Sequence, residues 1–239
     1  SFEIRVGEVF GMVGESGCGK STLGRAVCKL EKPTAGTIIL DGEDVSRAPE
    51  HKRAKFLGRV FQDPMKGTAA TMEIQENLAL AYRRGQKRGL RWGITKAERQ
   101  RYYEELNTLG LGLEERMTSK VGLLSGGQRQ ALTLLMASLQ KPKLLLLDEH
   151  TAALDPKTAA KVLELTEEII REHHLTAMMV THNMKDAIRL GNRLIMMHEG
   201  RIIYDVAGEA KMKLKVSDLM EKFEQASGGE FANDRMILG

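Results

Sequence analysis

The chain has 239 residues, of which 42% are hydrophobic and 28% are charged, and its formal net charge is +4. This composition is ordinary for a soluble globular protein with one large domain or two small ones, and no stretch approaches the roughly 20 apolar residues that span a bilayer. Two cysteines are too few for a disulfide framework, so a reducing compartment fits best.

The first 64 residues alternate between strand, helix and turn patterns. Apolar runs predict strands over 2–6 and 8–13, joined at Gly7, followed by a helix over 21–29. Asp41 and Gly42 predict the turn of a hairpin over 37–45, and Pro64 ends a short strand. No charged-then-apolar leader precedes these elements, which predicts no secretory signal.

Residues 65–142 show helical periodicity and predict a helical insertion between strands. Leu132, Leu135, Met136 and Leu139 follow the spacing of one buried helix face. A basic run over 83–91 is typical of a solvated loop, although it could also contact phosphates or an acidic partner. We expect no nucleic-acid binding, because that function needs a concentrated basic stripe.

The remaining elements return to an α/β pattern. Strands are expected over 143–149 and 175–182, and a hairpin over 193–205 turns at Glu199 and Gly200. Asp155 and Pro156 predict the start of a helix that ends near His173. After Gly208 we expect a polar tail, with Ser217 capping a short helix. Alternating strands and helices predict an α/β core.

A phosphate-binding loop lies between the second expected strand and the first helix. Its pattern is Gly14-x-x-x-x-Gly19-Lys20-Ser21, which is typical of nucleotide binding. Glycines let backbone N–H groups surround phosphate oxygens, Lys20 supplies a cation, and the Ser21 hydroxyl can bind Mg²⁺. The alternative is a chance glycine-rich turn. The expected ATP-binding residues here are Gly14, Glu15, Ser16, Gly17, Cys18, Gly19, Lys20, Ser21 and Thr22.

Polar side chains end three of the expected strands. Asp148 is a candidate Mg²⁺ ligand and Glu149 a candidate for polarising the attacking water, since ligands gather at the carboxyl ends of parallel strands. His182 could bind the γ-phosphate and orient Glu149, and Gln62 could bind Mg²⁺ and water. The alternatives are an acidic pair that caps a strand or pairs with nearby lysines, a structural histidine and an ordinary surface glutamine.

A second glycine-rich turn also opens a helix and could hold a phosphate. Its residues are Leu124, Ser125, Gly126, Gly127 and Gln128. Because one phosphate loop is already present, the purpose of the second requires an explanation.

The order of these motifs resembles that of the ATP-binding-cassette (ABC) ATPases over essentially the whole chain. The fold this implies is a phosphate-loop NTPase core with a mixed, mostly parallel sheet, a small antiparallel β part and a helical insertion. It implies one domain over 1–239, with the core at 1–64 and 143–208, the helical signature subdomain at 65–142 and a tail at 209–239.

The resemblance also implies a head-to-tail homodimer, or a pair with another ABC ATPase, around two ATP molecules. The turn at Leu124–Gln128 of one copy would close on the ATP held by the other, and Asp155 would lie in the loop that crosses the interface. Gln62 would sense Mg²⁺ and signal to the transport subunits. Glu149 and His182 argue against a nucleotide switch with little hydrolysis.

The sequence departs from the family pattern at three places. His150 stands where most members have proline, and a structural role is expected for it. Met136 stands where an arginine usually recurs. The upstream strand and the aromatic residue that stacks on adenine do not precede Ser1, so we expect weakened nucleotide affinity. Residues 1–45 resemble the peptide importers of the family, and residues from about 53 onward resemble a different importer branch. A recombined or engineered chain would explain this mixture.

The function this implies is the ATPase subunit of a solute importer, cytoplasmic and peripheral on the inner face of the cell membrane. Its implied partners are transmembrane permease subunits and, indirectly, an extracytoplasmic solute-binding protein. The alternative is a soluble ABC ATPase acting on ribosomes or DNA-repair complexes. Those ATPases typically carry two cassettes, a coiled-coil insertion or zinc cysteines, which this sequence lacks.

Overall fold

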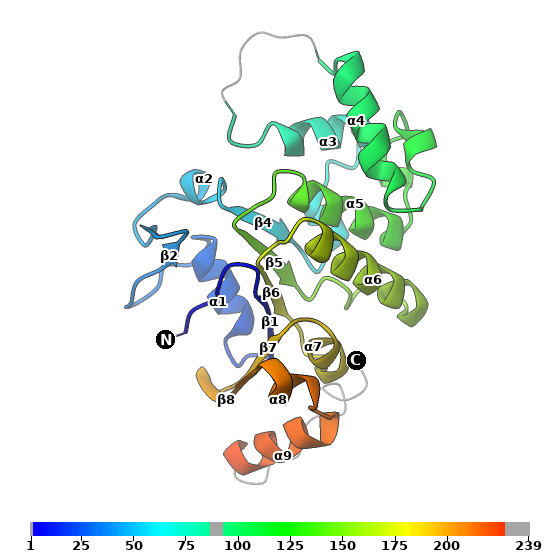
Figure 1. The fold of residues 1–239 in the computed structure, drawn as a ribbon. Coiled ribbons are helices and arrows are strands. Elements are labelled where there is room, and N and C mark those ends of the chain that lie inside the picture. The colour runs from blue at the N-terminus through cyan, green and yellow to red at the C-terminus, as the bar shows by residue number, and fades with distance from the viewer. Residues whose placement is uncertain (1, 87–92, 228–239) are drawn as a thin grey trace.

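A six-stranded sheet forms the centre of the molecule in the computed structural model, which describes residues 2–86 and 93–227 (Figure 1). The strand order is β4-β5-β6-β1-β7-β8, with all neighbouring pairs parallel except β7 and β8. The strands are β1 (Val9–Gly14), β4 (Leu57–Val60), β5 (Leu144–Asp148), β6 (Ala177–Val180), β7 (Arg193–His198) and β8 (Arg201–Ala207). This confirms the predicted mostly parallel α/β core.

Helices cover the sheet and extend from one end of it. They are α1 (Lys20–Val27), α2 (Glu50–Arg53), α3 (Ile74–Tyr82), α4 (Lys96–Asn107), α5 (Gly126–Ser138), α6 (Pro156–Glu172), α7 (Met184–Arg189), α8 (Gly208–Met212) and α9 (Val216–Ser227). Short 3₁₀ helices are η1 (Pro64–Gly67), η2 (Glu114–Arg116) and η3 (Val121–Leu123). The predicted hairpin is the small antiparallel pair β2 (Ile39–Leu40) and β3 (Glu43–Asp44).

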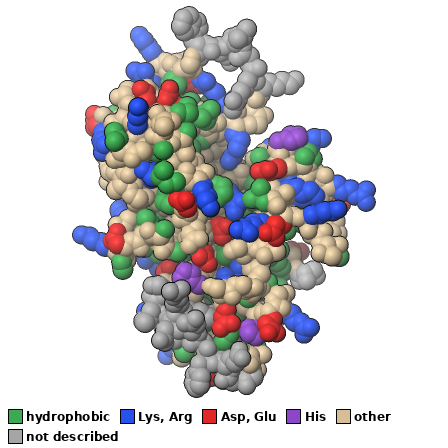
Figure 2. All heavy atoms as spheres, turned by 180° about the vertical axis from the view of Figure 1, so that it is seen from behind, with side chains coloured by type: hydrophobic (Ala, Val, Ile, Leu, Met, Phe, Trp, Pro, Cys, Tyr) green, Lys and Arg blue, Asp and Glu red, His purple; other side chains and the backbone are tan. Residues whose placement is uncertain are grey.

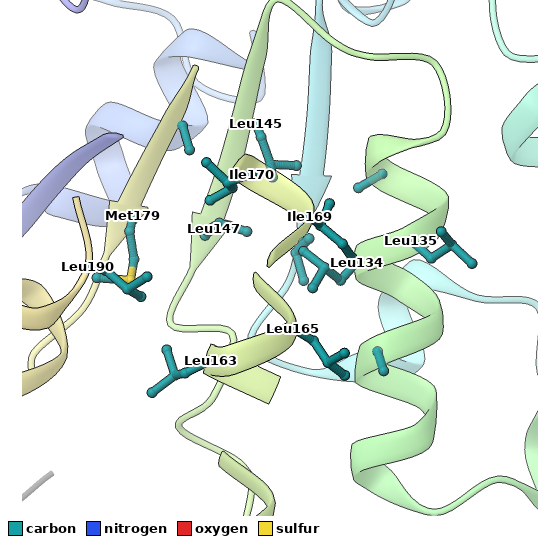
Figure 3. Packing of buried hydrophobic residues seen from close by; sticks show 14 of the residues in the cluster. Leu134, Leu135, Leu145, Leu147, Leu163, Leu165, Ile169, Ile170, Met179 and Leu190 are labelled. Atoms are coloured by element: carbon teal, nitrogen blue, oxygen red, sulfur yellow. The ribbon is translucent and has the colours of Figure 1, made fainter. Parts of the chain in front are cut away.

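The two faces of β5 bury different helices, because successive side chains of a strand point in opposite directions. Leu145 and Leu147 pack with Leu134 of α5 and Ile169 of α6 in one core cluster, as the close view in Figure 3 shows. Leu144 and Leu146 belong to a second cluster, together with Cys28 at the end of α1. Thus α1 lies on one face of the sheet and α5 and α6 lie on the other.

The region over 65–142 is helical, as predicted, and its helices begin at well-formed caps. Glu73, Thr95 and Ser125 each take part in a reciprocal capping box with the residue three positions later. Leu132 and Leu135 of α5 and its C-cap residue Leu139 are buried, and Met136 is partly buried, which confirms the predicted apolar face. The basic run over 83–91 lies partly outside the described residues, since 87–92 are not described.

A buried arginine fixes the far end of α1. The Arg53 guanidinium donates to the backbone oxygens of Ala26 and Val27, at 2.7 Å each, and to that of Ser46 at 3.0 Å. The side chain of Arg53 is fully buried. It therefore supplies partners for the carbonyl groups that a helix leaves open at its C-terminus.

Two predictions about the ends of the described chain are wrong. Residues 2–6 are not a strand, because β1 is already paired on both sides, by β6 and β7, and Phe2 instead stacks on Phe10. Ser217 lies inside α9, where the Asp218 carboxylate accepts from the N–H of Lys215.

The segment after Gly208 is also less polar than predicted. Leu219 and Phe223 of α9 are fully buried in the larger core cluster. The Lys211 ammonium donates to the backbone oxygens of Leu190 and Gly191, at 3.0 and 2.7 Å, and to that of Ile188. These contacts tie the segment over 208–227 to the sheet.

No helix in the described part of the chain is long and apolar enough to cross a membrane. On the face shown in Figure 2, basic and acidic side chains are intermingled rather than gathered in one stripe.

Candidate nucleotide site

The phosphate loop connects β1 to α1 along the middle of the sheet. Gly17 and Gly19 have φ angles of +86° and +102°, in the left-handed region that glycine adopts without steric cost. A Cβ atom on Gly14 would overlap the backbone oxygen of Met197 on β7. The loop therefore requires glycine for its turns and for its close approach to β7.

Lys20 is the first residue of α1, and its side chain is only 4% exposed. Its Nζ donates to the backbone oxygens of Gly14 and Glu15, at 2.7 Å each, and lies 3.5 Å from the Sγ of Cys18. The ammonium group thus sits inside the curve of the loop. Cys18 is itself buried at 5% exposure.

The loop fits a phosphate group. No side chain caps the N-terminus of α1, and its first turn contains no acidic residue. The open N–H groups and the positive end of the helix dipole favour an anion at this position. The predicted ATP-binding residues 14–22 are contiguous around it.

Asp148 ends β5 and faces α1. Its Oδ2 accepts from Nη2 of Arg59 on β4 at 3.0 Å, and both side chains are largely buried. The sequence reasoning did not identify Arg59, because the pair depends on the register between β4 and β5.

Glu149 follows Asp148 in a strained backbone conformation. Its φ angle is +46°, which costs a non-glycine residue about 1–3 kcal/mol. Its N–H donates to the backbone oxygen of Val180 at 2.9 Å, so the residue is fixed at the end of β6 as well as β5.

His182 and Glu149 lie together at this edge of the sheet. Nδ1 of His182 is 3.5 Å from Oε1 of Glu149, and the side chains are 27% and 21% exposed. Thr181 and Asn183 on either side form the turn into α7: the Thr181 hydroxyl accepts from the N–H of Asn183, whose side chain caps the helix. The structure thus places the predicted pair in contact.

Gln62 follows β4 at the same sheet edge, with an exposed side chain. The backbone beside it is anchored to α5, because Gln130 donates to the oxygen of Phe61 at 3.1 Å. Gln62 therefore lies at the junction between the sheet and the helical region.

The second glycine-rich turn lies at the N-terminus of α5, on the face of the sheet opposite α1. Ser125 is the N-cap, and its hydroxyl accepts from the N–H of Gln128 at 3.2 Å. Ser125 and Gly126 are exposed. The structure does not bring this turn onto the phosphate loop of its own chain.

The loop before α6 packs against this second turn. Asp155 caps α6 by accepting from the N–H of Thr158 at 3.1 Å. A Cβ on Gly126 would lie 3.4 Å from Cδ2 of Leu154, and one on Gly127 would overlap Cγ2 of Thr158. The two loops thus form one surface.

Two further histidines lie near the site. His150 is buried, its Nε2 is 3.1 Å from the Thr166 hydroxyl on α6, and burial lowers its pKa to about 4. It is therefore neutral at physiological pH and structural, as expected. His198 lies 3.9 Å from Glu15 and packs edge-on against Phe223, which connects α9 to the phosphate loop.

The donor groups at this edge suit a magnesium ion bound together with phosphate oxygens. Within residues 2–86 and 93–227, no cluster of three or more His, Cys, Asp or Glu side chains could hold a metal by itself. Mg²⁺ is usually bound by one or two carboxylates together with substrate phosphates and waters. Asp148 and the Ser21 hydroxyl fit that type of site.

A phosphate loop, an acidic strand end and a glutamate–histidine pair at one sheet edge define a nucleoside triphosphatase of the phosphate-loop class. The sequence pattern of the ABC transporter family matches residues 1–152, so the chain belongs to that family and is one of its ATPases.

Two curated relatives are transport proteins. The chain is 45% identical to the tyrosine transport ATP-binding protein of Clostridioides difficile over 230 residues, covering 95% of this chain and 90% of the relative. It is 37% identical to a methionine import ATP-binding protein of Pseudomonas putida, covering 85% of this chain and 59% of that relative. These relatives do not favour the alternative of a ribosome or DNA-repair ATPase. The tyrosine transport relative aligns with both parts of the chain that resemble different importer branches, residues 1–45 and those from about 53 onward.

Solved structures show the same architecture. The ATP-binding cassette MJ0796, solved as a dimer in a post-hydrolysis state with ADP and phosphate, matches with a TM-score of 0.72 and 30% identity, covering 86% of this chain and 88% of that one. The ADP conformation of the cassette MJ1267 matches in fold, with a TM-score of 0.77 and 24% identity over 96% of this chain and 91% of that one.

Proposed function

We propose that this chain hydrolyses ATP to drive the uptake of a small solute, with amino acids as the class favoured by the names of its relatives. The observation that carries the catalytic assignment is the contact between Glu149 and His182, 3.5 Å apart beside the phosphate loop.

The phosphate loop is proposed to bind the ATP phosphates. Open N–H groups of the loop and of the first turn of α1 donate to phosphate oxygens, and Lys20 supplies the cation. Ser21, Asp148 and Gln62 would hold Mg²⁺, which when bound neutralises charge on the phosphate oxygens. Lys20 already points into the loop, so it needs little rearrangement.

Glu149 is proposed to polarise the attacking water. Its carboxylate takes a proton from the water, whose oxygen attacks the γ-phosphorus while the bond to the bridging oxygen of ADP breaks. His182 donates to a γ-phosphate oxygen and keeps the Glu149 carboxylate in place. The products are ADP and inorganic phosphate.

The site is completed by a second copy. Because the turn over Leu124–Gln128 lies on the face of the sheet opposite α1, it can reach an ATP only on another molecule. Ser125 and the N–H groups of Gly126 and Gly127 would bind the γ-phosphate from that side, and Asp155 would lie at the interface. ATP then stabilises the pair, and hydrolysis weakens it.

The partners proposed are transmembrane permease subunits and, through them, an extracytoplasmic solute-binding protein. The helical region over 65–142 and Gln62 would face the permease. With these partners, the chain would lie in the cytoplasm, on the inner face of the cell membrane.

The Glu149→Gln variant tests this function. It should bind ATP and accumulate as an ATP-bound dimer on size-exclusion chromatography, while its turnover falls by at least about 100-fold. Glu168→Gln, an acidic residue of α6, serves as the control and should hydrolyse ATP normally. Wild-type turnover by Glu149→Gln would exclude Glu149 as the base.

A further inference from the structure

Arg59 makes an ion pair with the proposed magnesium ligand Asp148. Its Nη2 lies 3.0 Å from Oδ2 of Asp148, and the side chains are 16% and 22% exposed. The guanidinium carbon also lies 4.5 Å from the centre of the Phe61 ring. The ring covers one side of the guanidinium, so Arg59 is held by two independent contacts.

The strand register produces this contact. Arg59 is directly opposite Leu146, and Asp148 is two residues beyond Leu146 on the same strand. Residues two apart share a face, so Arg59 and Asp148 lie on the face where Leu57, Leu144 and Leu146 pack toward α1. Ser21 is in the first turn of that helix. The positive charge of Arg59 is therefore built into the side of the sheet where phosphates and Mg²⁺ would bind.

The charges have opposite consequences for ATP with and without magnesium. Without Mg²⁺, the Asp148 carboxylate repels the triphosphate, and Arg59 offsets that repulsion. With Mg²⁺, Arg59 repels the metal ion and competes for one carboxylate oxygen. Both effects are substantial because partly buried charges are weakly screened.

We infer that Arg59 is a positioning residue that neutralises Asp148 and thereby limits how strongly ATP binding depends on Mg²⁺. This inference rests on the proposed role of Asp148 as a magnesium ligand. In the nucleotide-free chain, Arg59 forms an ion pair with the Asp148 carboxylate. Mg²⁺ that arrives with ATP would either share this carboxylate with Arg59 or displace Arg59 from it.

The test compares ATP dissociation constants measured by titration calorimetry in excess EDTA and in excess Mg²⁺. The dissociation constant in EDTA divided by the dissociation constant in Mg²⁺ measures how strongly ATP binding depends on magnesium. Arg59→Met should raise that ratio about tenfold, because it weakens metal-free binding and removes repulsion of the ion. Arg59→Gln, which keeps a hydrogen-bond donor without the charge, should raise it likewise and serves if Arg59→Met does not fold. Arg59→Lys keeps the positive charge and should raise the ratio less than Arg59→Met does.

Arg193→Met is the matched control. Arg193 also pairs with a carboxylate, that of Asp205, lies 5.3 Å from the Phe10 ring and is 15% exposed, but it lies at the start of β7, away from the loop. Its removal should leave the ratio unchanged even if the melting temperature falls.

Asp148→Asn separates the two possible failures. If it lowers the ratio while Arg59→Met and Arg59→Gln leave the ratio at or below the wild-type value, the role of Arg59 is refuted and that of Asp148 stands. If Asp148→Asn leaves the ratio unchanged, the proposed magnesium role of Asp148 fails, and the inference about Arg59 fails with it.

Discussion

Gly127 at the start of α5 and Thr158 at the start of α6 pack so closely that a Cβ on Gly127 would overlap Cγ2 of Thr158. The same Thr158 gives its N–H to the Asp155 cap. The turn proposed to bind a partner's ATP and the loop proposed to cross the dimer interface are therefore packed directly against each other.

Gly127→Ala should destabilise the fold by about 1–3 kcal/mol, because the added methyl group forces α5 and α6 apart. Thr158→Ser removes the overlapped methyl group and keeps the backbone cap, so the double variant should recover most of the loss. Urea unfolding measures both. Gly126→Ala meets Leu154 only at ordinary contact distance and is the control. Equal stability of Gly127→Ala and Gly126→Ala would contradict the close contact.

Arg53→Met should lower the free energy of unfolding by about 2 kcal/mol or more. The variant keeps much of the side-chain volume but leaves the backbone oxygens that end α1 without their buried donor. Arg5→Met removes an 80%-exposed arginine and should change stability by less than about 0.5 kcal/mol. Chemical denaturation of both variants checks the prediction, and equal small losses would count against it.

Glu98 should contribute stability that acid removes. Hydrogen bonds from the backbone of Thr95 and from Arg83 lower the pKa of Glu98 below its ordinary value. A lowered folded-state pKa gives stability that is fully present above the ordinary glutamate pKa of about 4.3 and is lost as pH falls through the folded value. Glu98→Gln should therefore be less stable than wild type at pH 7, by about 1 kcal/mol, and the difference should shrink in acid. Melting curves from pH 7 to 3 test this, with Glu104→Gln on the exposed side of α4 as control; a constant difference would contradict it.

Ser125→Arg should abolish hydrolysis while leaving ATP binding to the same chain nearly intact, because the changed turn lies across the sheet from its own phosphate loop. Ser217→Arg, an exposed position near the start of α9, should retain activity. Wild-type activity should also rise with the square of protein concentration at low concentration.

Mixing variants gives a stricter measurement. Ser125→Arg has an intact phosphate loop and Lys20→Met an intact turn, so a mixed pair contains one complete site. The mixture should regain ATPase activity that neither variant has alone. A mixture as inactive as its components would contradict the shared site.

The local motifs of the site were predictable because each is set by adjacent residues. The phosphate loop, the cap at Asp155 and the hairpin turn at Glu199 and Gly200 all carry their geometry in a few neighbouring side chains. The buried strands β5 and β6 were equally clear, since their apolar runs are short and continuous.

Contacts that depend on register or distant packing were not predictable. The pairing of Arg59 with Asp148 follows from the alignment of β4 with β5. The overlap at Gly127 follows from how α5 packs on α6, and the burial of Phe223 from how α9 folds back on the sheet. Residues 2–6 are apolar enough for a strand, but both sides of β1 are already paired, with β6 and with β7.

The central place of β1 has a consequence for how the protein is made. This early strand pairs with segments that begin at residues 177 and 193, so its neighbours leave the ribosome long after it does. Contacts so distant in sequence form slowly, because a long loop must close first. The phosphate loop can therefore pack against Met197 only after most of the chain has been synthesised. A nascent chain halted before β6 would carry the complete ATP-binding motif without the two strands that hold β1 in the sheet.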